Sequence, residues 1–198
     1  MDLTDKYGEG WCITLAQIPK TDTLNLMGVP EPGSEPDGVA KASDRIADHV
    51  TEGGVLPLAL ELPRGWSLVL ELEGTAGWIG AGNSVLGLLT AEGRTAVTVF
   101  CDPNQCILLA AADGAVIGKL DLNTGTFTND VDQDHPVIDA LAALGFDPTD
   151  EGDPTGAADT EDRPTLVTLA VQALTGVTLT DDDFEGHWVG GLCTTGPP

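Results

Sequence analysis

The sequence is poor in basic residues, in histidine and in aromatic side chains. Its 198 residues contain 8 lysines and arginines, 3 histidines and 5% aromatic residues, against 32 aspartates and glutamates, so the formal net charge is −24. A chain with so few cations repels nucleic acid and anionic lipid surfaces. Direct binding of DNA or RNA and attachment to an anionic membrane are therefore the functions that this composition disfavours most.

Long hydrophobic runs are absent as well. No apolar run approaches the roughly 18 residues that a membrane-spanning helix needs, and the N-terminal segment MDLTDKYGEGW has neither the basic nor the apolar region of a signal peptide. The expected location is therefore the cytoplasm. Hydrophobic residues still make up 41% of the chain, which is enough for the core of one domain with a small appendage.

Cysteine is scarce. Cys12, Cys101, Cys106 and Cys193 are too few and too scattered for a disulfide scaffold, and a zinc site would need a second closely spaced pair. Cys101 and Cys106 flank a four-residue turn, across which a disulfide is geometrically allowed. A reducing cytoplasm favours two small buried hydrophobic side chains instead.

Apolar residues that alternate along the chain predict a mostly antiparallel sheet of about six strands. Pro63–Gly65 is expected to join two of them in a hairpin, and Asp113–Gly114 is a two-residue hairpin turn. Pro57 lacks an amide donor, so its strand is expected at an edge of the sheet. The expected strands are Gly10–Ile18, Val55–Leu62, Trp66–Glu73, Arg94–Cys101, Gln105–Ala112 and Ala115–Asp121.

Capping residues and apolar spacings of three and four predict short helices. Val29–Gly38 is dense in proline and glycine and is expected to be an exposed loop, and the tail from Cys193 onward is expected to fray. The expected helical segments are 21–28, 43–50, 84–93, 134–145, 164–176 and a last turn capped by Thr180.

These elements predict an α+β fold with short helices on one face of the sheet and a C-terminal helical segment. Residues 147–163 are strongly acidic and contain no large apolar side chain, so they are expected to be a linker. The predicted organisation is a core domain of residues 1–146, the acidic linker, and a helical segment of residues 164–198 that packs on the core.

The segment GAGNSV, Gly80–Val85, partly matches a dinucleotide-binding fingerprint. It follows a strand, opens a helix and precedes Asp102 by about 20 residues, where a ribose-binding acid would stand. Three features disagree: Val85 replaces the third small residue, the helix is short for a crossover, and the preceding strand is expected in a hairpin. A glycine-rich turn explains the segment better, so no cofactor is assigned.

Ser84 follows a strand-to-helix turn, as a nucleophilic serine does in some hydrolases. That pattern requires a glycine two residues after the serine, and Leu86 stands there. Serine is one of the residues most favoured at helix N-caps. Ser84 is therefore expected to cap the helix that follows it.

Two acidic segments are candidates for cation sites. Asn129–Asp134 has carboxylates at alternate positions, as in the first half of a calcium loop, but His135 replaces the required glycine and Leu141 the closing glutamate. Asp181–Asp183 and His187 also combine metal-ligand types. Three acids after a threonine are, however, typical of a capped first helical turn. No metal site and no catalytic residue is assigned.

Five segments occur in a familiar order along most of the chain: GWCITL, GWSLVLELEGTAGW, LLTAEGRTAVTVF, AAADGAVIGKLD and RPTLVTLAVQALTGVTLTDDDFEG. Together they resemble an uncharacterised family of bacterial proteins of unknown function, found mainly in actinobacteria and their phages. The resemblance implies no activity, cofactor or catalytic residue. The chain departs from the family after VTVF, where Cys101–Asn104 and Cys106–Leu108 replace an asparagine-rich turn and an aromatic strand.

The strong charge and the lack of a catalytic constellation favour a non-enzymatic protein that binds a basic surface of a partner protein, as an inhibitor, immunity or accessory factor. A solvated acidic surface with no partner is the simpler explanation of the charge taken by itself. The candidate contacts are Trp78, Gly80, Asn83, Asp102 and Asn104. Trp78 is included because tryptophan recurs at interface hot spots, although it would also serve as a lid on the core.

Two other hypotheses remain. The protein could mimic DNA and occupy a nucleic-acid-binding protein, in which case its binding would compete with DNA and weaken with salt. It could also be a small-ligand or nucleotide-binding enzyme that uses Gly80–Ser84 and Asp102.

Overall fold

One large antiparallel sheet organises the molecule. The computed structural model describes residues 2–8, 10–35, 39, 55–72, 77–128, 135–146 and 162–193. Within these residues every paired strand is antiparallel to its neighbour. The strand order is β2 (Gly33–Glu35), β9 (Trp188–Gly190), β3 (Leu58–Glu61), β4 (Ser67–Leu72), β1 (Trp11–Ala16), β5 (Thr95–Cys101), β6 (Cys106–Ala112), β7 (Ala115–Asp121) and β8 (Phe127–Thr128).

The described part of the chain thus contains nine strands rather than about six. The α+β class and the antiparallel sheet are as expected. The three additional strands, β2, β8 and β9, have only two or three residues each. Segments this short show no period-two pattern, so their pairing partners decide that they are strands. The partners of β2 and β9 lie far away in the sequence, whereas β8 pairs with the preceding strand β7.

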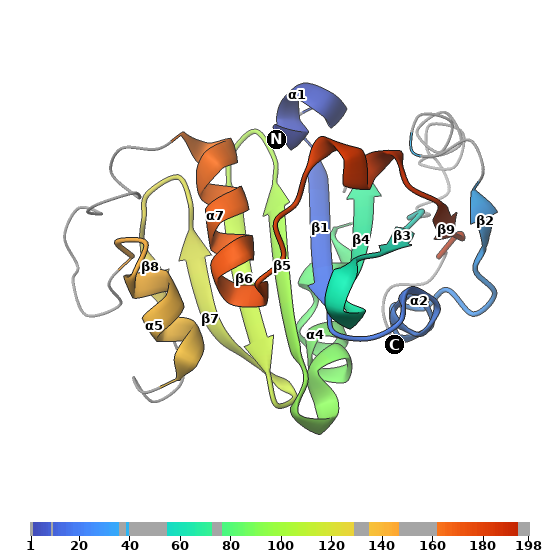
Figure 1. Ribbon diagram of the computed structural model, residues 1–198, viewed down its shortest axis with the longest axis horizontal. Helices are drawn as coiled ribbons and strands as arrows, with labels where there is room; N and C mark the ends of the chain where they lie inside the picture. Colours follow the sequence, from blue (N-terminus) through green and yellow to red (C-terminus); the bar gives the residue numbers. More distant parts are fainter. Residues whose placement is uncertain are drawn as a thin grey trace.

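Helices cover both faces of the sheet, which corrects the expectation that they lie on one face. Figure 1 shows α5 and α7 in front of the sheet and α4 behind it. The helices are α1 (Leu3–Tyr7), α2 (Lys20–Leu26), α4 (Asn83–Thr90), α5 (Pro136–Ala142) and α7 (Arg163–Thr175), with short 3-10 turns η2 (Pro63–Gly65), η3 (Ile79–Ala81), η4 (Ala91–Gly93) and η5 (Asp181–Glu185).

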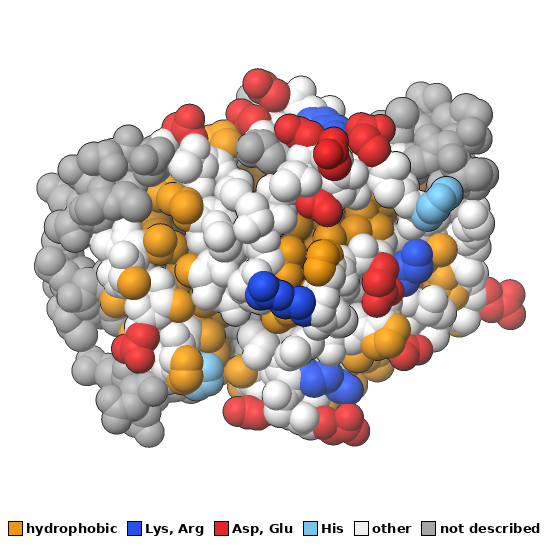
Figure 2. Space-filling model, in the orientation of Figure 1, with side chains coloured by type: hydrophobic (Ala, Val, Ile, Leu, Met, Phe, Trp, Pro, Cys, Tyr) orange, Lys and Arg blue, Asp and Glu red, His pale blue; other side chains and the backbone are white. Residues whose placement is uncertain are grey.

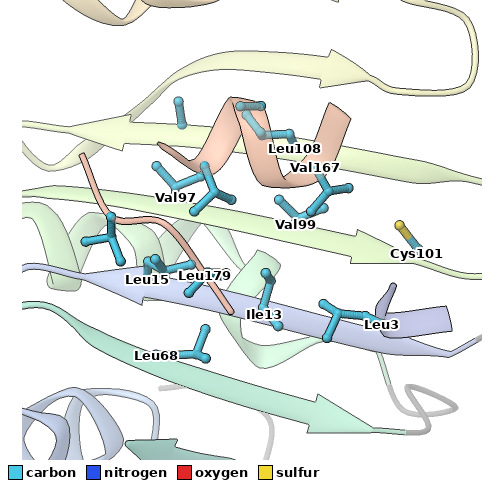
Figure 3. Close-up of a cluster of buried hydrophobic side chains, with 14 of the residues drawn as sticks. Leu3, Ile13, Leu15, Leu68, Val97, Val99, Cys101, Leu108, Val167 and Leu179 are labelled. Atoms are coloured by element: carbon cyan, nitrogen blue, oxygen red, sulfur yellow. The ribbon is translucent and has the colours of Figure 1, made fainter. Parts of the chain in front are cut away.

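The front face carries the larger hydrophobic core. Ile13 and Leu15 of β1 and Val97 and Val99 of β5 pack with Val167 of α7 (Figure 3). These strand residues alternate with side chains that point to the other face, as strand geometry requires. Each is fully buried, which stabilises the fold by roughly 1.5–3 kcal/mol per large apolar side chain.

The back face has a second core between the sheet and α4 and α2. Val85, Leu86 and Leu89 of α4 and Leu24 of α2 are fully buried there. Their partners on the sheet are mostly small residues, such as Ala16 and Ala96. The small side chains let α4 approach the strands closely.

The chain crosses over between β4 and β5. Both strands are antiparallel to β1, which lies between them, so β4 and β5 are parallel to one another. The segment that links them carries η3 and α4 across the back face. The expected hairpin of β3 and β4 is confirmed, but that hairpin does not prevent a helical crossover from following it.

The C-terminal residues are part of the sheet. β9 pairs with β3 on one side and with β2 on the other, so β3 is not the edge strand that Pro57 predicts. Pro57 lies just before β3, where no ladder bond is lost. Cys193, expected at the start of a frayed tail, is buried and forms an isolated bridge with Val55.

Several local predictions are confirmed. The hairpin turn at Asp113–Gly114 has positive φ at both residues, and Gly176 ends α7 in the left-handed conformation. Phe146 folds back so that its amide donates to Leu141 O, and its side chain is buried. Thr180 and Asp183 form a capping box at η5.

The N-cap prediction for Ser84 is wrong, because α4 begins at Asn83 and Gly82 is its N-cap residue. The predicted helix 43–50, the acidic segment 129–134 and most of the predicted linker lie outside the described residues. None of the helices that can be described is long and apolar enough to cross a membrane.

Candidate functional site

A cluster of polar side chains lies buried at the centre of the back face. Glu71 of β4 stands directly opposite Cys12 of β1, and Thr14 of β1 stands directly opposite Thr98 of β5. All four side chains point toward η3, and all four are 0% exposed. This polar cluster is unusual because a glutamate is rarely buried completely without a cation beside it.

Two backbone amides take the place of a cation. Ile79 N donates to Glu71 Oε2 at 2.7 Å, and Gly80 N donates to Glu71 Oε1 at 2.8 Å. The ion pairs found among the described residues, Lys6–Glu185 and Arg94–Glu92, involve other carboxylates. Burial raises the pKa of Glu71 to about 7, although the two amides and the Cys12 thiol act in the opposite direction. Glu71 therefore changes charge near neutral pH.

Cys12 is not an activated nucleophile. Burial, reinforced by the charge of Glu71, raises the pKa of the Cys12 thiol well above its ordinary value. A nucleophilic cysteine needs the reverse, a lowered pKa and access to solvent. Cys12 instead contributes a hydrogen bond to Glu71 inside the cluster.

The threonine hydroxyls of the polar cluster hold the backbone of η3 against the sheet. Thr98 Oγ1 donates to Gly80 O at 2.9 Å and lies 2.9 Å from Thr14 Oγ1. A Cβ atom at Gly80 would collide with Thr14 Oγ1 and would come within 3.0 Å of Glu71 Oε1. Gly80 is thus required for close approach to the sheet rather than for a positive φ.

This geometry bears on the dinucleotide hypothesis. A phosphate-binding glycine loop offers free backbone amides to its anion. Here the amides of Ile79 and Gly80 are already bound to the Glu71 carboxylate, and Gly80 is buried. The amides that would bind a phosphate are therefore occupied by the Glu71 side chain of the protein itself.

The five candidate contacts fall into two groups. Trp78, Gly80 and Asn83 belong to the segment around η3, where Trp78 is half-buried, Gly80 buried and Asn83 exposed. Asp102 and Asn104 belong to the turn between β5 and β6. Gly80 lies over Thr98, four residues before Asp102 on an extended strand, which corresponds to about 13 Å. The fold therefore does not bring the two groups into one site.

Asp102 has a local structural role. Its Oδ1 accepts from Asn104 N at 2.8 Å and from Gln105 N at 3.1 Å, and Gln105 Nε2 donates to its Oδ2 at 2.9 Å. The Gln105 side chain and then the Asn104 amide lower the pKa of Asp102. A disulfide between Cys101 and Cys106 links the two ends of this turn, where two reduced thiols were expected.

An acidic face is formed where α1 meets η5. We define it as Asp5, Asp181, Asp182, Asp183 and Glu185. Figure 2 shows acidic side chains gathered along the upper edge of the molecule, where Figure 1 places α1. The Tyr7 and Phe184 rings join the two elements at a centroid distance of 6.1 Å. Lys6 is the cation in this face, with Nζ 3.5 Å from Glu185 Oε1.

The acidic face affects its neighbour Tyr7. Burial, followed by the charges of Glu185 and Asp181, raises the pKa of Tyr7. The Tyr7 hydroxyl is buried and makes no hydrogen bond.

A hollow of about 300 Å³ lies elsewhere, between α5, α7 and the ends of β5 and β6. Its wall combines small apolar residues with a few polar ones, among them Asp113 and His135. His135 Nδ1 already accepts from Val137 N at 3.2 Å. Across the residues that the structure describes, no group of three or more His, Cys, Asp and Glu side chains is arranged to hold a metal ion, Asp181–Asp183 with His187 included.

Sequence reasoning did not identify the polar cluster. It placed Glu71 in a strand whose faces are Ser67, Val69 and Glu71 on one side and leucines on the other, which is typical of a strand with one solvated face. The signal that could have found it is the glycine pair of the following segment, which permits a close backbone approach to such a strand.

Comparison with known proteins adds the family but no activity. No curated protein and no solved structure matches the chain significantly. One family model matches residues 2–187, which is nearly the whole chain and includes the polar cluster and the acidic face. The chain therefore belongs to DUF6461, a family of unknown function.

Proposed function

We propose that this protein acts without catalysis, by binding a basic surface of a partner protein through the acidic face on α1 and η5. The observation that carries the proposal is the concentration of five carboxylates around a single lysine on two packed elements. Such a patch attracts a positively charged partner from a distance and orients it on approach. An inhibitor, immunity or accessory role fits this mode of action.

The net charge of −24 supports the same conclusion. Asp5, Asp181 and Asp182 are exposed, and within the described part of the chain no hydrogen bond to their carboxylates is found. They are therefore available to a partner, whereas Asp183 caps η5 through Thr180. The polar cluster does not compete as a reactive centre, because Cys12 and Glu71 are both fully buried.

The test compares two variants with equal charge. Asp5→Asn, Asp181→Asn and Asp182→Asn together neutralise the acidic face. Asp22→Asn, Asp113→Asn and Asp139→Asn remove three exposed carboxylates elsewhere and form the matched control. Each tagged protein is used at low salt to capture proteins from a lysate of the source organism after nuclease treatment. Captured proteins are then purified and titrated against the wild type and both variants.

The expected result is a basic protein whose affinity falls by about 10-fold for the acidic-face variant and changes little for the control. Equal weakening by both variants would show that total charge matters and that the acidic face does not. Capture of nothing at low salt would contradict the proposal. Displacement of the partner by duplex DNA would identify the interaction as DNA mimicry.

A further inference from the structure

The hollow between the sheet and the helices α5 and α7 exists because the side chains that meet there are short. Thr95 of β5 and Ala112 of β6 stand directly opposite each other and form its floor. Ala140 of α5 and Ala173 of α7 line its walls. Both helices lie in front of the sheet (Figure 1), and these short side chains leave about 300 Å³ between helices and strands unfilled. Such a volume is at the lower end of the range for small-molecule pockets.

One carboxylate lines the hollow without a cation beside it. Asp113 lies in the turn between β6 and β7, and among the described residues its side chain makes no hydrogen bond and no ion pair. Arg94, just before β5, is engaged elsewhere: its Nη1 lies 3.1 Å from Glu92 Oε2, and its Nε donates to Leu89 O at 3.3 Å. Asp113 is therefore available to a cation from outside the protein.

The turn that carries Asp113 is held in place by α4. Gly114 N donates to Thr90 Oγ1 at 3.1 Å, and Thr90 Oγ1 in turn donates to Leu86 O at 2.7 Å. The backbone beneath the Asp113 carboxylate is thus fixed before a ligand arrives, which reduces the entropy that binding costs.

The remaining lining is apolar or neutral. Val137 of α5 and Leu174 of α7 present aliphatic side chains. His135 Nδ1 accepts from Val137 N at 3.2 Å, so the proton of the neutral ring is on Nε2 and the imidazole adds a donor at the rim. The hollow therefore combines an apolar wall with a single negative charge.

We propose that this hollow binds a small organic amine, whose ammonium group pairs with Asp113 and whose apolar body packs against Val137 and Leu174. An ammonium has three N–H donors, for which the Asp113 carboxylate and the Thr95 hydroxyl are acceptors. Organic anions are disfavoured by the same carboxylate and by the net charge of −24. A hard metal ion would require more oxygen ligands than this apolar wall supplies.

The amine site is separate from the acidic face. Trp11, which follows α1 at the start of β1, pairs with Cys101 at the end of β5, whereas the hollow lies at Thr95, where β5 begins. Seven extended residues separate the two ends of β5 by roughly 20 Å. The amine site and the proposed partner surface are therefore tested independently, and the failure of one proposal does not decide the other.

Phenethylamine is the probe, because it joins a primary ammonium to an apolar ring. Phenethyl alcohol, in which a hydroxyl replaces the amine, and phenylacetate, an anion, are the matched comparisons. Each is titrated into the isotope-labelled full chain, and amide chemical shifts are followed by NMR. We expect saturable shifts at Asp113, Ala140 and Ala173 with phenethylamine, an affinity about 10-fold lower for the alcohol, and no binding of phenylacetate.

Two variants with equal charge separate the site from the field of the whole protein. Asp113→Asn removes the carboxylate but keeps the turn, because asparagine also tolerates positive φ. It is expected to weaken phenethylamine about 10-fold and to leave phenethyl alcohol unchanged. Asp139→Asn removes an exposed carboxylate of α5 that does not line the hollow, and should change neither affinity. Equal weakening by both variants, or equal wild-type affinities for amine and alcohol, would overturn the proposal.

Ala173→Leu tests the location by filling the hollow from α7. Ala173 is exposed on its helix, and leucine is a good helix former, so the fold should tolerate the change. Binding of both phenethylamine and phenethyl alcohol is expected to be lost. Unchanged binding of phenethylamine in this variant would place the amine elsewhere and contradict the proposal, as would the absence of saturable shifts in the wild type.

Discussion

Glu71 on β4 and Cys12 on β1 face each other directly across the sheet, and both side chains are fully buried. The Glu71 charge raises the pKa of the Cys12 thiol, whereas the thiol donates a hydrogen bond to the carboxylate and so lowers the pKa of Glu71. The pair joins the central strand of the sheet to the segment that crosses its back face. Perturbing either residue should therefore affect the stability of the whole fold.

Stability should fall as pH rises through neutrality. The pKa of Glu71 is about 7 in the folded state and 4.5 in the unfolded state, so between these values the folded protein binds one more proton. Its contribution is fully present below pH 4.5 and is lost as pH rises through 7. The loss is about 3 kcal/mol in the free energy of unfolding. Urea titrations at pH 5 and pH 8 measure it.

Glu71→Gln provides the control for this pH dependence. Every other titratable group of the chain is unchanged in the variant. The difference between wild type and variant therefore isolates Glu71. A variant that loses as much stability as the wild type over this range would show that Glu71 has an ordinary pKa.

Elements stabilised by neighbours in the sequence could be predicted well. β5, β6 and β7 are joined by tight turns, and their predicted bounds differ from the observed ones by one residue at most. Asp113–Gly114 identifies the hairpin turn because both residues tolerate positive φ. In these strands the local pattern and the tertiary structure agree.

The features that the sequence did not predict, β2, β9 and the burial of Glu71, depend on contacts between distant segments. β2 and β9 are three residues long and form because β9 inserts between β2 and β3. Nothing in residues 33–35 alone predicts this pairing. The burial of Glu71 likewise depends on the position of η3 and α4, and so the sequence pattern of β4 predicts a solvated face that the fold covers.

Gly80→Ala should destabilise the protein by about 1–3 kcal/mol. The added methyl group would collide with Thr14 Oγ1 and crowd Glu71 Oε1, both of which belong to the buried polar cluster. Gly33→Ala is the matched control, because the nearest atom to its Cβ would be Gly190 O at 4.0 Å. Urea midpoints of the two variants decide the question. Equal losses would show that η3 can move away from the sheet at little cost.

Alkylation should detect two reactive thiols in the unfolded, unreduced protein. Cys101 and Cys106 are linked by a disulfide, whereas Cys12 and Cys193 are buried thiols. In denaturant without reductant, iodoacetamide is therefore expected to modify Cys12 and Cys193, and prior reduction should raise the count to four. Peptide mass spectrometry locates the modified residues. Four modified cysteines before reduction would contradict the disulfide.

Trp188→Ala should cost about 3–5 kcal/mol, because it leaves a large cavity in the core. The Trp188 side chain is 1% exposed, its ring lies 6.0 Å from that of Phe184, and its Nε1 donates to Phe184 O at 3.1 Å. It thereby fixes β9, the strand that ties the C-terminal residues into the sheet.

Trp78→Ala is the comparison for Trp188→Ala, since Trp78 is half-buried at the start of η3. Its loss of stability should be clearly smaller, as measured by the two urea midpoints. If Trp188→Ala cost less than 1 kcal/mol, β9 would be held by backbone pairing alone. The C-terminal residues would then form an appendage, and the acidic face on η5 would be free to move relative to α1.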